Sequence, residues 1–306
     1  MKADQASQAG ARVRSDRPFK GIGLMLAGSG LITMNDAAIK LVVDDHSVSQ
    51  AILVRAAFAL PVIAWLAYRA GGWQAARWHN PWAQLLCAVP LVASLFLFVT
   101  SLSRIPIAPA TVILYLSPLF LTALAPLLGE SVGWRRWGAV LLGFVGTVLV
   151  IEPAGDTFTW FYLVPVCAAF VLAVRDLATR KLVESESSVS ILLVSTLAVM
   201  ASAVPGAVTS WQPLAPGDVA LLAVSGLAFG FAMFFLTDAF RYADASLVSP
   251  FKYAGVIVAA TLGFAIWGDV PTLSACIGGL LIVSSGLFVL KREQAIAADQ
   301  EDVPRT

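Results

Sequence analysis

Several ionisable side chains lie inside long apolar stretches of this chain, where an isolated charge is costly. Asp36 and Lys40 are four residues apart in the first stretch, a spacing that places them on one face of a helix. Arg175 and Asp176 hold the corresponding place in a later stretch. A charge within lipid hydrocarbon needs a partner, a water-filled cavity or a function. These side chains are therefore the first candidates for contact with a polar solute or a coupling ion.

Further candidates share this setting. Arg55 lies about two turns inside the second stretch, and Lys252 lies next to Tyr253 near the middle of the ninth. The complete set of candidates for substrate binding or coupling is Asn35, Asp36, Lys40, Arg55, Tyr115, Arg175, Asp176, Lys252 and Tyr253. This mixture of charges suits a zwitterion, because the cations can bind a carboxylate and an aspartate can bind an ammonium.

Each charge also has a structural interpretation. Lys40 is close enough to a helix end for its ammonium to reach the interface by snorkelling. Asp36, Arg175, Asp176 and Lys252 are too deep for that, so we expect a cavity or an internal ion pair around them. A structural lock, substrate contact and uptake of a coupling proton all remain open for these residues.

The sequence argues against an enzyme. It contains no phosphate-binding loop, no H-E-x-x-H and no G-x-S-x-G motif. Its two histidines, His46 and His79, fall in predicted loops. Its three cysteines, Cys87, Cys167 and Cys276, lie in apolar segments at spacings that fit neither a disulfide framework nor a zinc site. We therefore expect no metal, no cofactor and no energy supply from ATP bound to this chain.

Composition indicates the elements that must position these residues. The chain is 58% hydrophobic and 13% charged, whereas soluble domains carry about a quarter charged residues. We predict an all-α polytopic membrane protein, because lipid leaves the backbone no partner outside a helix. Ten stretches approach the roughly 20 residues that a crossing helix needs. They are 20–43, 49–69, 82–103, 107–128, 134–152, 159–182, 189–210, 217–240, 245–267 and 273–291.

The second five stretches repeat the first five. Asp36 and Asp176 are 140 positions apart, and Gly146 and Gly286 match at the same offset. A unit with an odd number of crossings must enter the membrane the other way up when it is duplicated, as in many secondary transporters. We predict repeats at 20–153 and 154–292, with polar tails at 1–19 and 293–306. Helices one to four and six to nine should surround a central cavity, with the fifth and tenth outside it.

Lysine and arginine concentrate in one set of connections, whereas Arg104 alone represents them in the other set. The positive-inside rule then places both termini in the cytoplasm and the protein in the inner (plasma) membrane. Trp65 and the other tryptophans lie at predicted span ends, so they are interpreted as interface anchors. Pro118 and Pro250 each follow a serine inside a predicted span and are candidates for kinks or gating points.

Several short motifs occur together in this framework. The first helix carries Asn35-x4-Lys40, the fourth ends in Leu-Gly-Glu130, and Trp267-Gly268-Asp269 precedes Gly278-Gly279 in the tenth. In these features the chain resembles the EamA branch of the drug/metabolite transporter superfamily. The resemblance implies ten helices in two inverted halves. It also implies a secondary transporter, and members that export amino acids, including aromatic ones, are the nearest in character.

The expected function is therefore export of amino acids or similar small metabolites by alternating access. The alternatives are a passive channel or facilitator, an exporter of drug-like compounds, and an intramembrane enzyme. The expected partners are the lipid bilayer and a small-molecule substrate, with a zwitterionic amino acid as one candidate. No nucleic acid is expected, and the protein is expected to be a monomer or a homodimer.

Overall fold

The computed structural model of the chain describes residues 18–72, 77, 79–128, 132–152, 158–182, 186–242 and 249–301. These residues form helices and, within the described ranges, no strands. In the described part of the chain, nine helices are long and apolar enough to cross a membrane, and a shorter apolar helix covers Phe251–Trp267. The predicted all-α polytopic class is confirmed.

The first five crossings agree with the predicted spans within a few residues. Their bounds are α2 (Pro18–Val43), α3 (Val48–Arg69), α4 (Pro81–Leu102), then α5 (Ile107–Leu114), α6 (Ser117–Leu124) and η2 (Ala125–Leu128) in one crossing, and α7 (Trp134–Ile151). The second five are η3 (Trp160–Tyr162) with α8 (Leu163–Leu182), α9 (Ser188–Thr209), α10 (Pro216–Tyr242), then η4 (Ser249–Tyr253), α12 (Ala254–Leu262) and η5 (Gly263–Trp267), and α13 (Leu273–Glu301).

Local sequence explains where these helices begin. The Ser47 hydroxyl accepts the Gln50 backbone N–H at 3.3 Å, and the Ser187 hydroxyl accepts the Ser190 N–H at 3.0 Å. The Asn80 side chain accepts the Ala83 N–H at 3.1 Å ahead of α4. Each cap satisfies one of the backbone donors that a helix start leaves unpaired.

The fourth and ninth crossings are segmented. The fourth is interrupted between α5 and α6, directly before Pro118, whose ring lacks the N–H that would bond Leu114. The ninth passes from the 3₁₀ turn η4, which contains Pro250, through α12 to the π turn η5. These are the two crossings in which the sequence predicts kinks, and any role in gating remains a prediction.

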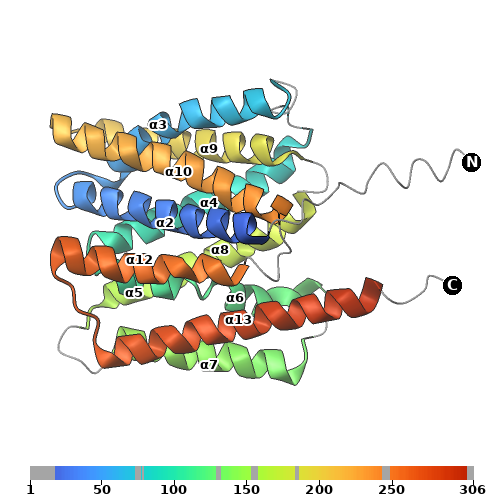
Figure 1. Ribbon diagram of the computed structural model, residues 1–306. Coiled ribbons are helices and arrows are strands. Elements are labelled where there is room, and N and C mark those ends of the chain that lie inside the picture. The colour runs from blue at the N-terminus through green and yellow to red at the C-terminus, as the bar shows by residue number, and fades with distance from the viewer. Residues whose placement is uncertain are drawn as a thin grey trace, which may run out of the picture.

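Six of the crossings are linked by helix contacts, and we divide them into two groups of three. The α3 group contains α2, α3 and α10, in which α10 packs on both α2 and α3. The α9 group contains α8, α9 and α4, in which α4 packs on both α8 and α9. The two groups meet where α3 packs on α9. In Figure 1, α7 and α13 lie together at the bottom of the view, away from α3, α9 and α10.

Glycines set the closest approaches between helices. A Cβ built on Gly146 of α7 would lie 2.7 Å from the Gly278 oxygen of α13, and a Cβ on Gly278 would meet the Gly146 oxygen in turn. On α10, Gly226 faces the backbone of Arg55, and a Cβ on Gly230 would lie 2.6 Å from Val62 Cβ. Close packing through these glycines is the role expected for small residues in membrane helices.

Candidate functional site

A cavity of about 690 Å³ lies between the two helix groups. Its described lining comes from α3 and α10 of the α3 group and from α4, α8 and α9 of the α9 group. Among the described residues, none from α2, α7, α13 or the fourth and ninth crossings lines it. The described parts of the first, fourth and ninth crossings therefore do not line this cavity, contrary to expectation. The exclusion of α7 and α13 agrees with expectation.

The cavity lies toward one end of the helices. Along α3 it runs from Arg55 to Ala70 at the helix end, and on α10 it reaches Tyr242. This is the end at which α2 begins and α13 finishes, on the right in Figure 1. We call it the termini end.

Polar and steric contacts close the opposite end. The side chain of Ser49 on α3 lies directly against Gly206 of α9. Gln50 donates to the Gln212 carbonyl at 2.6 Å and accepts the Gln212 N–H at 3.1 Å. His46 Nε2 lies 3.8 Å from the Asp218 carboxylate. A solute in the cavity therefore meets packed side chains on this side, whereas the cavity itself extends to the termini end.

Arg55 is the most constrained side chain in the cavity wall. It is 4% exposed, and its Nη1 donates to Asn35 Oδ1 at 3.1 Å. The Ser225 hydroxyl donates to the same oxygen at 2.8 Å, and Asn35 Nδ2 donates to Asp36 at 2.8 Å. The Arg55 guanidinium lies 4.7 Å from the centre of the Phe229 ring. Three predicted residues are thus brought together, with Asn35 between an arginine and an aspartate.

Arg175 also lines the cavity, from α8. Its Nη1 lies 2.9 Å from Asp176 Oδ1, so two neighbouring residues form an ion pair. Both side chains are partly exposed, at 26% and 37%. The expected internal ion pair is present on this helix, in contact with the cavity.

Lys40 has a structural position. It is buried, and its ammonium donates to the Leu102 carbonyl at 2.5 Å and to the Ile105 carbonyl at 3.0 Å. It also lies 5.3 Å from the Trp267 ring centre. The last carbonyls of a helix lack intrahelical donors, and a cation is favourable there. Snorkelling is therefore the wrong interpretation of Lys40, which completes the end of α4 and does not line the cavity.

The tyrosine pair and Lys252 lie apart from the cavity lining. The rings of Tyr115 and Tyr253 are 4.9 Å apart, and the Tyr115 hydroxyl donates to the Lys252 carbonyl at 3.0 Å. The Lys252 side chain is exposed, and among the described residues its ammonium has no partner. The structure thus does not bring these three candidates to Arg55 and Arg175.

Other cavity residues had no clear signal in the sequence. Trp65 was interpreted as an interface anchor, yet it lines the cavity and packs 6.0 Å from Phe234, measured between ring centres. Phe229 lies within the Gly226-x-x-x-Gly230 segment that packs against α3, and this motif was the available clue. Ser225, which holds Asn35, lies one residue before it.

A buried carboxylate joins the start of α9 to the start of α4 at the termini end. Glu186 Oε1 accepts the backbone N–H groups of His79 and Asn80, each at 2.6 Å, and its Oε2 accepts the Ser190 hydroxyl at 3.3 Å. Burial by itself raises the pKa of Glu186, but the backbone donors of Asn80 and His79 outweigh it. The carboxyl pKa is therefore held below its ordinary value.

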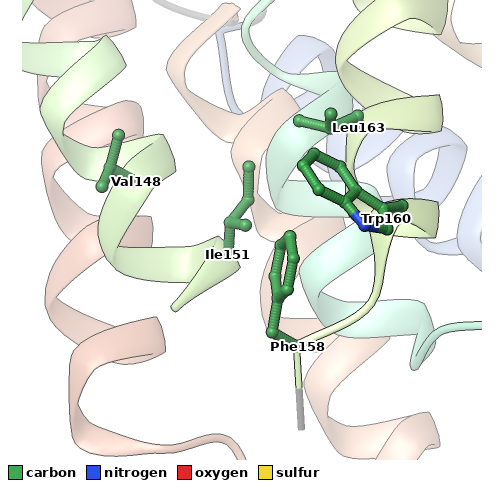
Figure 2. A pocket seen from close by; sticks show the side chains of 5 residues that line it. All are labelled: Val148, Ile151, Phe158, Trp160 and Leu163. Carbon is green, nitrogen blue, oxygen red and sulfur yellow. The ribbon is translucent and has the colours of Figure 1, made fainter. Parts of the chain in front are cut away.

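A second cavity, shown in Figure 2, lies near the opposite end. Five side chains from the end of α7 and the start of the sixth crossing line it: Val148, Ile151, Phe158, Trp160 and Leu163. The Trp160 indole supplies their one N–H donor. None of these five side chains carries a charge with which to orient a polar solute.

Comparison with known proteins identifies the family. The sequence profile of the EamA-like transporter family matches residues 19–152 and again residues 159–291. The chain belongs to this family. It is therefore a multi-pass membrane transporter, and the expectation that it is not an enzyme is confirmed.

Curated relatives are similar over most of this EamA-family chain. An S-adenosylmethionine uptake transporter of Rickettsia prowazekii is 29% identical over 73% of this chain and 76% of its own length. A riboflavin transporter of Rhizobium johnstonii is 30% identical over 77% of each. A pseudopaline exporter of Pseudomonas aeruginosa is 25% identical over 60% of this chain and 66% of its own length.

One solved crystal structure overlays with a TM-score of 0.58 at 19% identity, covering 92% of this chain and 99% of the other. At that identity the likeness extends to the fold alone.

Proposed function

We propose that this EamA-family protein is a secondary transporter that moves small amphipathic metabolites by alternating access. The observation that carries the proposal is a cavity that reaches the termini end while Ser49, Gly206 and the glutamine pair close the opposite end. Ligand sites commonly occupy about 300–1,000 Å³, so the cavity has the size of a binding site. A permanently open channel would lack such one-sided closure.

The two helix groups are the bodies that we propose to move. Almost the whole cavity wall is divided between α3 and α10 on one side and α4, α8 and α9 on the other. Each group combines two crossings of one half with one of the other half. Rocking about the α3–α9 contact would close the termini end and open the opposite one. The substrate drives this shift only through different affinities for the two states.

We propose that the substrates are amino acids and conjugates that contain them, and that the protein exports them from the cell. Mixed charge at Arg55, Arg175 and Asp238, beside aromatic side chains, suits a zwitterion with a large apolar part. Relatives named for S-adenosylmethionine and riboflavin favour heteroaromatic metabolites of this kind. Drug-like compounds without charged groups would leave the arginines unused.

We expect purified protein in liposomes to exchange labelled substrate against the same unlabelled compound. S-adenosylmethionine, riboflavin, tryptophan and phenylalanine form the first panel, loaded on either side in turn. Exchange that is faster than net efflux is the property of a carrier that reorients with substrate bound. Net flux without counterflow would instead identify a passive channel, and no flux of any compound would contradict the proposed substrates.

We further propose that residues 20–153 and 154–292 are inverted repeats, with both termini in the cytoplasm of a cell whose inner membrane holds the protein. Cysteines at Ser47 and Thr272 should then react with an impermeant maleimide from outside the cell. Cysteines at Gly133 and Ser187 should react only after the membrane is permeabilised. The reversed pattern would place the termini outside and would reverse each repeat.

A further inference from the structure

We propose that Arg55 is an anion-binding group and that the transported compounds carry a carboxylate on an aromatic or heteroaromatic body. The inference rests on the proposed function, since it takes the cavity as the transport site. It adds the chemical class that this site selects, and it separates the roles of Arg55 and its neighbours.

Arg55 has donor capacity that the protein leaves unused. Arg55 lines the cavity although only 4% of the residue is exposed. Its Nε is buried and has no hydrogen-bond partner. Among the described residues its one hydrogen bond goes to Asn35. No described carboxylate oxygen lies within the 4.0 Å limit of a salt bridge to Arg55. A buried cation in this state is stabilised by an anion that binds from the cavity.

Asn35 holds the guanidinium in place, and Asp36 behind it supplies a countercharge that makes no direct hydrogen bond to Arg55. Asn35 Oδ1 is held by Arg55 and by Ser225, and the Asn35 amide donates to Asp36. The neutral Asn35 amide therefore separates the nearest aspartate from the arginine. Asn35, Asp36 and Ser225 are positioning residues, because they set the direction of Arg55 and do not line the cavity.

The charges of the cavity wall favour an anion. Among the described residues, the charged ones that line it are Arg55, Arg69, Arg175 and Asp238. Asp176 pairs with Arg175, which leaves Arg55 and Arg69 facing Asp238. Charges that line a low-dielectric cleft concentrate a ligand of opposite sign.

Aromatic side chains continue the wall from Arg55 to the cavity mouth. Phe229 lies beneath the Arg55 guanidinium, and Phe234 and Trp65 follow toward the termini end. Trp65 is 42% exposed, so part of its ring is open to a ligand, and Arg69 lies 5.4 Å from its centre. A planar ring can stack on such faces. The carboxylate would then reach Arg55 while the ring occupies the wider part.

The test compares ligands that differ only in the anion. Full-length protein in detergent is titrated with three pairs: tryptophan and tryptamine, indole-3-propionate and indole-3-propanol, and S-adenosylmethionine and its decarboxylated form. Hydrogen bonds between charged groups are roughly twice as strong as neutral ones. We expect each carboxylate to bind at least about tenfold more tightly than its partner, and Arg55→Gln to abolish that preference.

Matched variants separate binding from folding. Arg104→Gln removes an arginine that stacks on Phe161 outside the cavity, and it should retain the full preference. Ser225→Ala keeps Arg55 and its charge but releases Asn35, so it should weaken carboxylate binding several-fold without affecting the neutral partners. This variant keeps the test decisive if Arg55→Gln does not fold.

The inference is overturned if both members of each pair bind equally, if no carboxylate binds at millimolar concentration, or if the preference survives both Arg55→Gln and Ser225→Ala. Counterflow distinguishes this failure from failure of the transport proposal. Exchange of compounds without a carboxylate would support the transport proposal and contradict the anion site. Arg55-dependent carboxylate binding without any exchange would support the anion site and contradict the transport proposal.

Discussion

A disulfide between Ser49→Cys and Gly206→Cys is expected to stop solute exchange, reducing counterflow by at least about tenfold. The variant is made in a background in which Cys87, Cys167 and Cys276 are replaced by serine. Reduction of the disulfide should restore exchange. The expected effect is large because the bond would hold α3 and α9 together at the end that must open for the other half of the cycle.

The structure supports the geometry of this bond. A Cβ on Gly206 would lie 2.8 Å from Ser49 Cβ, about 1 Å shorter than the mean Cβ separation in disulfides. A small outward shift of one helix therefore closes the bond. Ser49 belongs to the α3 group and Gly206 to the α9 group, so the link joins the two proposed moving bodies.

A matched control lies within one group. A Cβ on Gly230 of α10 would lie 2.6 Å from Val62 Cβ on α3, a similar approach of a glycine to a side chain. The disulfide between Val62→Cys and Gly230→Cys should leave counterflow near the cysteine-free level, because these helices move together. Full exchange with the Ser49–Gly206 link complete would refute rocking about the α3–α9 contact. Loss of exchange in the control would refute the division into these two groups.

Replacement of Glu186 by glutamine is expected to destabilise the protein by about 2 kcal/mol near neutral pH, seen as a thermal midpoint several degrees lower. The carboxylate accepts two backbone N–H groups and the Ser190 hydroxyl while its side chain is fully buried. Glutamine keeps the shape and one acceptor oxygen but loses the charge that strengthens these bonds. Fluorescence-monitored unfolding of detergent-solubilised protein measures the difference.

The contribution of Glu186 to the stability of the protein depends on pH with a definite sign. Because the folded pKa of Glu186 is below its ordinary value of 4.5, the charged form stabilises the fold at all pH values above 4.5. That contribution declines as pH falls through the folded pKa. The midpoints of Glu186→Gln and wild type should therefore differ at about pH 7 and converge as the pH falls below 4.5. Asp44→Asn, at an exposed residue of the opposite end, serves as control. A difference that stays constant across this range would show that the charge is not responsible.

The sequence alone determined the crossings and much of their local form. Hydrocarbon thickness requires apolar helices of a set length, so the spans follow from composition. Ser47 and Ser187 start helices because their hydroxyls cap backbone N–H groups. The break before Pro118 follows from a missing donor. The high cost of buried charge was enough to select Arg55 and Arg175, which do line the cavity.

Tertiary structure decided which side chains meet. Lys40 completes the end of α4, Trp65 faces the cavity, and Tyr115 and Tyr253 pair away from it. A membrane helix can be apolar both where it faces lipid and where it faces its neighbours. The sequence therefore indicates how deep a residue lies in the membrane, but it poorly indicates which side of the helix faces the cavity. That direction depends on close approaches such as Gly230 against Val62, which form only when helices from different parts of the chain pack together.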